Sequence, residues 1–345
     1  MSPSPNRRSF LKSSSTLFAG GICANLLSQP SRRARYGQGD FQYEQVPGWG
    51  ELDPAQTPVN NCHGLAHTSD GHIVLLTDHT QNNVIVYDRA GKLVSKWGMN
   101  FPKAHGLVLR EEDNRDVLYI TDLDRNAVFK TTLDGELIDE WGPPIDQPQY
   151  DEKKRYRPSW TLHFDDGGFL VLDGYGKDYF IHYDAQGRFK KINGGPEGGI
   201  VHWGPHGGLP IPGSNDEMLI AMSDQQYLLR MNRDGDILEK TPLPGGNPRS
   251  IKFHDDHYYI AHLADNWPAD RNSRGFLSVL DRNLKVVSNI AGTPPEYDSR
   301  GALQKMAHQE PLFIHPHDLI LDNEDSLYCA QFASNQTYPI KLVRV

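Results

Sequence analysis

The chain has 345 residues, of which 37% are hydrophobic, and it contains 32 glycines and 24 prolines. This length allows one large domain or two smaller ones, and the many turn-forming residues are typical of a loop-rich fold rather than a helical bundle. The formal net charge of −9 at pH 7 argues against a nucleic-acid partner, because such proteins present a basic surface to phosphate.

Residues 1–35 differ in composition from the rest of the chain. Arg7 and Arg8 precede a mildly apolar run from Leu17 to Leu27, in a segment with six basic residues and no acidic one. This pattern is typical of a twin-arginine export signal, and the run is too short to span a membrane. We therefore predict a periplasmic or secreted protein whose mature part has 29 basic and 44 acidic residues, a net charge of −15. The alternative is a basic terminus with no role in export.

Three cysteines occur, and Cys23 falls within the predicted signal. In an oxidising compartment Cys62 and Cys329 could form a disulfide, but they could equally be buried thiols. The sequence leaves both alternatives open.

Six related segments follow one another from residue 63 to the C-terminus. Each contains short β-rich runs separated by Asp-Gly and similar turns. A period of about 42 to 50 residues with four strands per unit predicts a β-propeller, in which each unit buries its apolar faces against its neighbours. The segments span residues 63–98, 105–142, 159–194, 206–241, 249–290 and 317–345.

The sixth segment has room for three strands, not four. Residues 41–50 end in Trp-Gly, as do the last strands of the first two segments. We predict that this N-terminal stretch supplies the missing strand and so removes an exposed sheet edge. The predicted fold is all-β: one six-bladed propeller over residues 36–345, with aromatic-Gly endings and Asp-Gly turns that resemble NHL-type repeats.

Long connections are predicted to gather on one face of the propeller, where binding and catalytic sites usually lie. Within one of them, residues 299–309 are predicted to form a short helix that caps the channel. The long segments are 99–104, 143–158, 195–205, 263–275 and 291–316.

Histidine recurs at one position of the repeat. The residues that open the first strand of the six units are His63, His105, Ser159, His206, Arg249 and His317. Since 15 of 345 residues are histidine, chance places about a quarter of a histidine in six positions. A lone histidine is usually a hydrogen-bonded core residue, but four at one level of a channel favour a metal site.

Alternate blades carry His105, His206 and His317, so these three should surround the axis with approximate threefold symmetry. Three imidazoles leave a coordination position open for water or substrate, as in catalytic zinc sites. His63 lies between two of them and could be a fourth ligand or a proton shuttle. Zinc is the expected metal, although imidazole also suits copper, nickel and iron.

The motifs "AHGLVL", "GPHGGL", "HPHDLIL" and "LDGYG" resemble those of peptidylamidoglycolate lyase, the lyase domain of peptidylglycine α-amidating enzymes. That family is a six-bladed NHL-type propeller. The resemblance implies zinc on the three alternate histidines, with Tyr175 as a base or a metal-linked phenolate.

The resemblance also implies a structural calcium ion held by backbone carbonyls of Leu107, Gly208 and Leu319. Two loops that carry substrate-binding arginines in the family, 77–83 and 222–227, have none here. The nearby arginines that could replace them are Arg125, Arg249, Arg271 and Arg274, and His315 stands where the family has methionine.

The favoured function is an exported metal-dependent enzyme acting on a small-molecule or peptide-like substrate. It would be a zinc lyase for an α-hydroxy-amide, or a zinc hydrolase, with Tyr175 as general base and Arg249 binding an anionic group. The alternative is a non-catalytic NHL-type propeller that binds protein or carbohydrate through Trp160, Trp203, Trp267 and Tyr297. A calcium-dependent lactonase-like hydrolase ranks last, because the channel ring has histidine, serine and arginine rather than carboxylates.

Overall fold

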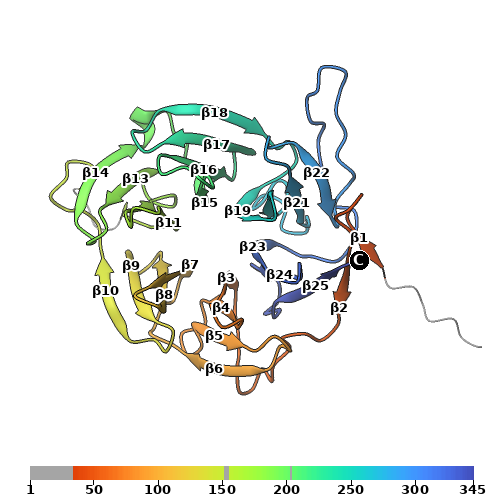
Figure 1. Cartoon of the computed structure of the whole chain (residues 1–345), viewed down its shortest axis with the longest axis horizontal. Helices are drawn as coiled ribbons and strands as arrows, with labels where there is room; N and C mark the ends of the chain where they lie inside the picture. Colours follow the sequence, from red (N-terminus) through yellow and green to blue (C-terminus); the bar gives the residue numbers. More distant parts are fainter. Residues whose placement is uncertain (1–33, 151–154, 203) are drawn as a thin grey trace, which may run out of the picture. The chain divides into compact units, whose positions relative to one another are not determined.

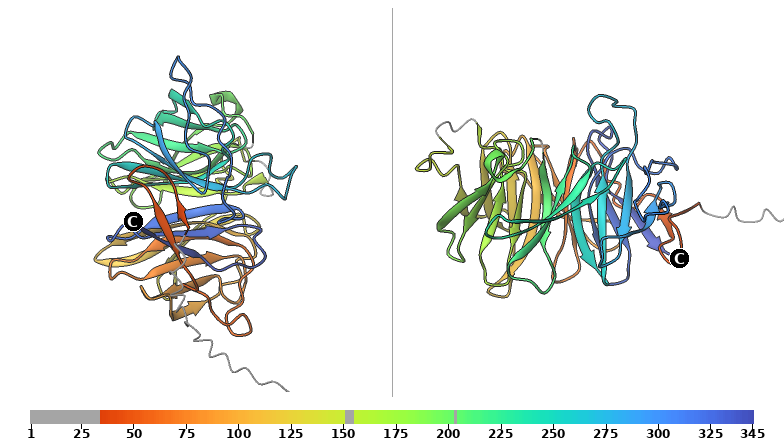
Figure 2. Two further views of the ribbon diagram at one scale, coloured as in Figure 1. Left: turned by 90° about the vertical axis from the view of Figure 1, so that its right-hand side faces the viewer. Right: turned by 90° about the horizontal axis from the view of Figure 1, so that it is seen from above.

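The computed structural model describes residues 34–150, 155–202 and 204–345. These residues form six antiparallel sheets arranged as blades around a central axis (Figure 1). Seen from the side, the strands run between two loop-bearing faces (Figure 2). The predicted six-bladed, all-β propeller is therefore confirmed.

Each blade runs from an inner strand at the channel to an outer strand at the rim. Blade 1 comprises β3 (Cys62–His67), β4 (Ile73–Thr77), β5 (Val84–Tyr87) and β6 (Leu93–Trp97). Blade 2 comprises β7 (Ala104–Glu112), β8 (Arg115–Asp122), β9 (Ala127–Thr132) and β10 (Leu137–Trp141). Blade 3 comprises β11 (Trp160–His163), β12 (Phe169–Leu172), β13 (Tyr179–Tyr183) and β14 (Phe189–Gly194).

The other three blades follow the same plan. Blade 4 comprises β15 (Pro205–Pro210), β16 (Glu217–Met222), β17 (Tyr227–Asn232) and β18 (Ile237–Pro242). Blade 5 comprises β19 (Pro248–His254), β20 (His257–His262), β21 (Phe276–Leu280) and β22 (Val286–Ile290). Blade 6 comprises β23 (Pro316–Leu321), β24 (Leu327–Gln331), β25 (Ile340–Arg344), β2 (Tyr43–Val46) and β1 (Arg35–Tyr36).

The N-terminal strand closes the ring as predicted. β2 pairs antiparallel with β25, with Tyr43 opposite Arg344 and Val46 opposite Lys341. This pairing covers the hydrogen-bonding edge of β25, which would otherwise template unwanted strand pairing.

The apolar interior consists of six clusters, one between each pair of neighbouring blades. Between blades 1 and 2, for example, Leu76 and Val86 pack against Leu118 and Phe129, all of them almost fully buried. When a sheet is covered on both faces, the sequence of its strands is almost continuously apolar, as in the "IVLL" of β4. Each inner strand is thus fixed by two interfaces.

Both described cysteines are free, buried thiols. Cys62 lies in the cluster between blades 6 and 1, and Cys329 lies in the cluster between blades 5 and 6. The disulfide alternative is therefore not realised. Among the described residues no helix is long and apolar enough to cross a membrane. Residues 1–33 of the predicted export signal lie outside the described residues.

One of the long segments does not have the predicted conformation. Residues 299–309 form no helix; instead, bridges between Gly292 and His308 and between Tyr297 and Leu303 make a hairpin-like excursion that leaves the rim beyond β22 (Figure 1). The helix prediction was wrong because Gly301, at φ +81°, sits in a tight turn capped by Asp298, whose Oδ1 accepts the amide of Ala302 at 2.9 Å. Segment 195–205 contains one short 3₁₀ helix, η2 (Pro196–Gly198).

Candidate functional site

Four histidines meet on the channel axis, each held there by the inner strand that it helps to begin. His63, His105, His206 and His317 lie on β3, β7, β15 and β23 and are at most 5% exposed. The ring centroids of His105, His206 and His317 are 4.6–4.9 Å apart. His63 lies 4.8 Å from His317 and 5.3 Å from His105. The four histidines that share one position in the sequence repeat are therefore also neighbours in the structure.

The three alternate histidines share one hydrogen-bond arrangement. Nδ1 of His105 contacts the carbonyl oxygen of Ser159 at 2.9 Å, Nδ1 of His206 contacts that of Arg249 at 2.9 Å, and Nδ1 of His317 contacts that of His63 at 2.7 Å. Each acceptor belongs to the ring residue of the next blade. A carbonyl can only accept, so each Nδ1 carries the proton and each Nε2 is left with a lone pair. This is the usual way in which a protein orients imidazole ligands toward a metal.

A glycine after the histidine makes this contact possible in two blades. A Cβ on Gly106 would lie 2.6 Å from the oxygen of Ser159, and a Cβ on Gly207 would lie 2.4 Å from the oxygen of Arg249. These are the same carbonyls that accept the histidine protons. The "His-Gly" pairs in the sequence therefore reflect close packing of neighbouring inner strands.

The free ring nitrogens fit a metal ion. Within the described chain, Nε2 of His105 and Nε2 of His206 are buried and have no hydrogen-bond partner, and a buried polar atom left in that state is costly. Ligand nitrogens of His63, His105 and His317 lie within 4.8 Å of one another, so this group could hold a metal ion. Burial holds the pKa of His105, His206 and His317 well below the usual value, with neighbouring positive charges adding to the effect. Neutral imidazoles are the form that binds metals.

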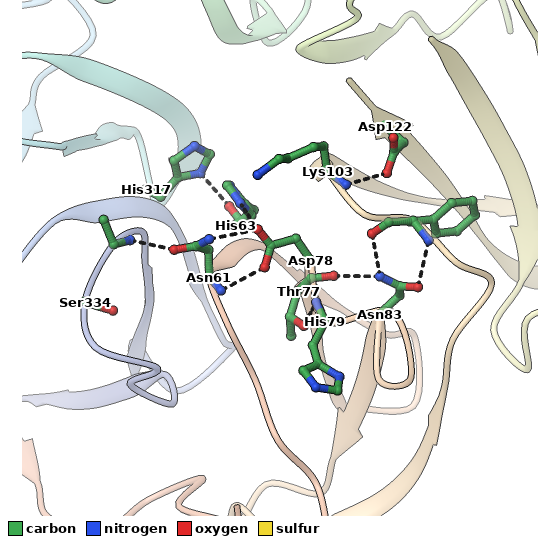
Figure 3. A network of polar contacts seen from close by, with 12 residues as sticks. Asn61, His63, Thr77, Asp78, His79, Asn83, Lys103, Asp122, His317 and Ser334 are labelled. Carbon is green, nitrogen blue, oxygen red and sulfur yellow. Dashed lines mark hydrogen bonds and ion pairs between the residues drawn. The ribbon is translucent and has the colours of Figure 1, made fainter. Parts of the chain in front are cut away.

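His63 is held differently from the other three. Its Nε2 lies 3.7 Å from Oδ2 of Asp78 (Figure 3), and its Nδ1 is buried without a partner among the described residues. Although burial opposes ionisation of Asp78, hydrogen bonds from His63 and Asn61, together with the charge of His63, keep the pKa of that carboxyl below its usual value. His79, which also lies after β4, points away from His63 (Figure 3).

Tyr175 reaches the histidines from the loop after β12. Its ring packs edge-on against His105 at 5.0 Å and against His206 at 5.7 Å. Burial raises the pKa of Tyr175, while the charge of Arg249 and a hydrogen bond to it act in the opposite direction. Asp173 fixes this loop: it accepts hydrogen bonds from the hydroxyl of Tyr150 and the amides of Arg157 and Lys177 at 2.6–2.8 Å. Burial nevertheless raises the pKa of Asp173 to about 7.

Arg249 lies at the start of β19, and its backbone carbonyl accepts the proton of His206. The residue is 7% exposed, its Nε has no partner among the described residues, and a guanidinium nitrogen lies 3.9 Å from Asp224. A buried guanidinium nitrogen without a partner is suited to receive an anionic ligand.

A cavity of about 360 Å³ opens above the histidines. The sequence-predicted residues that line it are His63, His105, Tyr175, Arg249, Trp267, Arg271 and His317. Sequence reasoning missed a second group of lining residues: Asp78, Lys103, Leu123, Arg157, Asp224, Leu263, Pro268 and Phe332. Three of the long segments contribute, through Lys103, Arg157 and the 263–275 insertion. Two of these residues, Lys103 and Arg157, could have been predicted, because each lies just before an inner strand and therefore near the mouth of the channel.

Several residues that the sequence singled out fall outside this cavity. Arg125 packs over the ring of Phe129 at 4.0 Å, and Trp160 is 2% exposed, so it offers no surface for a protein or carbohydrate partner. Trp203 lies outside the described residues. His315 is not part of the histidine ring: both of its nitrogens contact backbone carbonyls, of Phe332 and of Ser273.

The implied calcium site draws on backbone carbonyls of three inner strands. Leu107, Gly208 and Leu319 do lie on the inner strands β7, β15 and β23. The carboxylate beside Leu319, that of Asp318, is fully buried and already bonded to the amide of Leu65 at 2.9 Å and to Nζ of Lys252 at 3.2 Å. Lys252 thus already pairs with this carboxylate, and a calcium ion on the three backbone carbonyls stays a prediction.

No family model and no curated protein matches this sequence. Solved structures with a similar fold include a streptogramin B lyase (TM-score 0.55, 13% identity, covering 89% of this chain and 97% of that one). A virginiamycin B lyase from Staphylococcus aureus has a TM-score of 0.53 at 13% identity, covering 90% of this chain and 100% of that one. A luciferin-regenerating enzyme has a TM-score of 0.52 at 10% identity, covering 83% and 92%. At these identities the likeness shows the shared propeller fold.

Proposed function

We propose that this chain is an exported, metal-dependent lyase of the peptidylamidoglycolate lyase type, acting on an α-hydroxy-amide. The observation that carries the proposal is the set of three buried imidazoles, each oriented by a carbonyl of the next blade, beneath a cavity that also receives Tyr175 and Arg249. Three of the similar structures are named as lyases, and one of these three is a catalytically inactive histidine-to-alanine variant of virginiamycin B lyase with quinupristin.

His105, His206 and His317 would hold the metal, with zinc as the first choice. These three share the same Nδ1 arrangement, whereas His63 is engaged by Asp78. When bound, a divalent metal ion acts as a Lewis acid on a substrate oxygen and stabilises the negative charge that develops there.

The protein groups would move two protons. His63, whose imidazolium the Asp78 carboxylate would stabilise, takes the proton of the substrate hydroxyl. As the new C=O bond forms, the C–N bond breaks and its electron pair passes to nitrogen. Because burial raises the pKa of Tyr175, its hydroxyl is protonated at pH 7. We therefore propose that Tyr175 donates a proton to the departing amide nitrogen, instead of acting as the general base that the sequence suggested. Arg249 binds an anionic group of the substrate through its unpaired Nε.

Hydrolysis is the wider form of the same proposal, because the same groups could activate water instead of a substrate hydroxyl. The products separate the two reactions. Cleavage of an N-acyl-α-hydroxyglycine by the lyase route yields an amide and glyoxylate, whereas hydrolysis of the acyl bond yields the free acid.

Metal analysis of untagged protein tests the ligand assignment. His206→Ala should abolish stoichiometric metal, whereas His63→Ala should retain the metal and lose turnover of N-acyl-α-hydroxyglycine. The matched control is His79→Ala, since His79 points away from His63 (Figure 3). Loss of metal in His63→Ala with normal metal in His206→Ala would reassign the third ligand. If folded wild-type protein binds no metal, the proposed metal-dependent activity is refuted and a non-catalytic binding propeller is favoured.

A further inference from the structure

The cavity above the histidines has one reactive side and one apolar side. His63, His105, His317, Tyr175 and Arg249 form the first. The apolar side consists of Leu123, Leu263, Trp267, Pro268 and Phe332. Neither the metal nor the proton transfers of the proposed function require this apolar side, so its chemistry must be explained separately.

Two aromatic rings form a corner on the apolar side. The rings of Trp267 and Phe332 have centroids 5.7 Å apart and are inclined at 83°. Phe332 in turn lies 5.2 Å from the ring of His63. A flat group seated in this corner would therefore be next to the reacting centre, not at a distant end of the substrate.

The corner is held in place before any ligand arrives. His315 packs against Trp267 at 4.7 Å, and its two ring nitrogens contact the carbonyls of Ser273 and Phe332, each at 3.1 Å. The insertion that carries Trp267 is thereby joined to blade 6. Preorganised aromatic surfaces bind flat groups at little entropic cost.

The charges around the cavity select for an anion. Lys103, Arg157, Arg249 and Arg271 line it against two acids, Asp78 and Asp224, in a chain whose net charge is −9. Neither Lys103 nor Arg271 forms a side-chain ion pair within the described residues, and Figure 3 shows Lys103 directed toward His63 and His317. A cluster of cations on an acidic protein concentrates anionic ligands.

The cavity is also small. A volume of about 360 Å³ lies at the lower end of the range of about 300–1,000 Å³ for ligand sites. It accommodates one ring and a short polar chain better than an extended peptide.

We propose that the substrate is a small aromatic carboxylate, with its ring in the Trp267–Phe332 corner and its anionic group at Arg249. Trp267 is then the residue that determines specificity, and Lys103 and Arg271 attract the anion at the entrance. The inference rests on the proposed function for the identity of the reacting bond, but the recognition of ring and charge is independent of turnover.

Calorimetric titration of zinc-loaded and metal-free protein with phenylacetate, acetate and phenylacetamide tests the proposal. Phenylacetate should bind at least about tenfold more tightly than acetate, which lacks the ring, and than phenylacetamide, which lacks the charge. Trp267→Ala should remove the advantage over acetate while acetate binding is unchanged. Arg271→Ala should weaken both acids; the matched control is Arg282→Ala, which removes a similar arginine–aromatic contact outside the cavity.

The outcomes separate the aromatic-carboxylate site from the proposed metal-dependent catalysis. Equal binding of phenylacetate and acetate, or an aromatic preference that survives in Trp267→Ala, would overturn the aromatic site even in an active metalloenzyme. Equal binding of acid and amide would overturn the anion site. Ring- and charge-dependent binding by a protein that takes up no metal would support the site while removing the proposed catalysis.

Discussion

The contact between Gly207 and the carbonyl of Arg249 allows a direct test of how the proposed metal site is built. A Cβ at position 207 would lie 2.4 Å from that oxygen, and real contacts of this kind are not found below 3.0 Å. In Gly207→Ala the inner strands of blades 4 and 5 must therefore separate by about 0.6 Å or more. The hydrogen bond from His206, now 2.9 Å, would stretch to about 3.5 Å, the limit of useful hydrogen bonding.

Loss of such an orienting bond lowers metal affinity by about 10- to 100-fold, or about 1.4–2.7 kcal/mol. Overpacking costs about 1–3 kcal/mol of stability, which a domain stable by about 5–15 kcal/mol survives. The assay is zinc titration against a competing chelator, with urea unfolding of the metal-free protein alongside it. Gly142→Ala is the matched control, because a Cβ there meets no atom within 4 Å. A folded Gly207→Ala protein with wild-type zinc affinity would refute the role of the carbonyl.

Tyr175→Phe should lower kcat by about 10²- to 10⁴-fold with metal content unchanged; equal kcat values would remove Tyr175 from the mechanism. Because burial lowers the pKa of His105, His206 and His317 below 6.5, the folded metal-free protein binds fewer protons than the unfolded chain. Its Tm should therefore fall as the pH drops from 6.5 to 5, and a smaller fall in His206→Gln would support this origin, whereas an identical fall would not. Asp318→Ala should cost about 3–5 kcal/mol in urea unfolding, since it leaves the ammonium of Lys252 unpaired; a cost under about 1 kcal/mol would contradict the pairing. Replacing Arg7 and Arg8 with lysine should keep the protein in the cytoplasm in cell fractionation, and unchanged export would rule out the twin-arginine route.

The repeat explains why the sequence predicted the ring so well. Once the period is known, every residue that opens a unit must lie at one level of the channel, so His105, His206 and His317 converge although more than 200 positions separate the first from the last. Closure by residues 41–50 was predictable for a related reason, because an unpaired β25 would leave an edge exposed.

The remainder of the site depends on segments that do not follow the repeat. Trp267 belongs to an insertion found in blade 5 alone among the described blades, and its place over the cavity depends on His315, in another blade. The helix prediction for 299–309 was wrong for the same reason. This segment lies outside the repeat, and its conformation is set by the local turn at Asp298 and Gly301. The carbonyl partners of the imidazoles were not predictable either, because every residue has a carbonyl.

Blades with two different structural roles alternate around the channel. Blades 2, 4 and 6 each present an imidazole, and blades 3, 5 and 1 each provide the carbonyl that sets its direction. Those carbonyls belong to Ser159, Arg249 and His63, whose side chains take no part in the contact. These three side chains can therefore vary, and with them the chemistry beside the imidazoles, without disturbing the direction of any imidazole. A propeller organised in this way could change its reaction while keeping the proposed metal site.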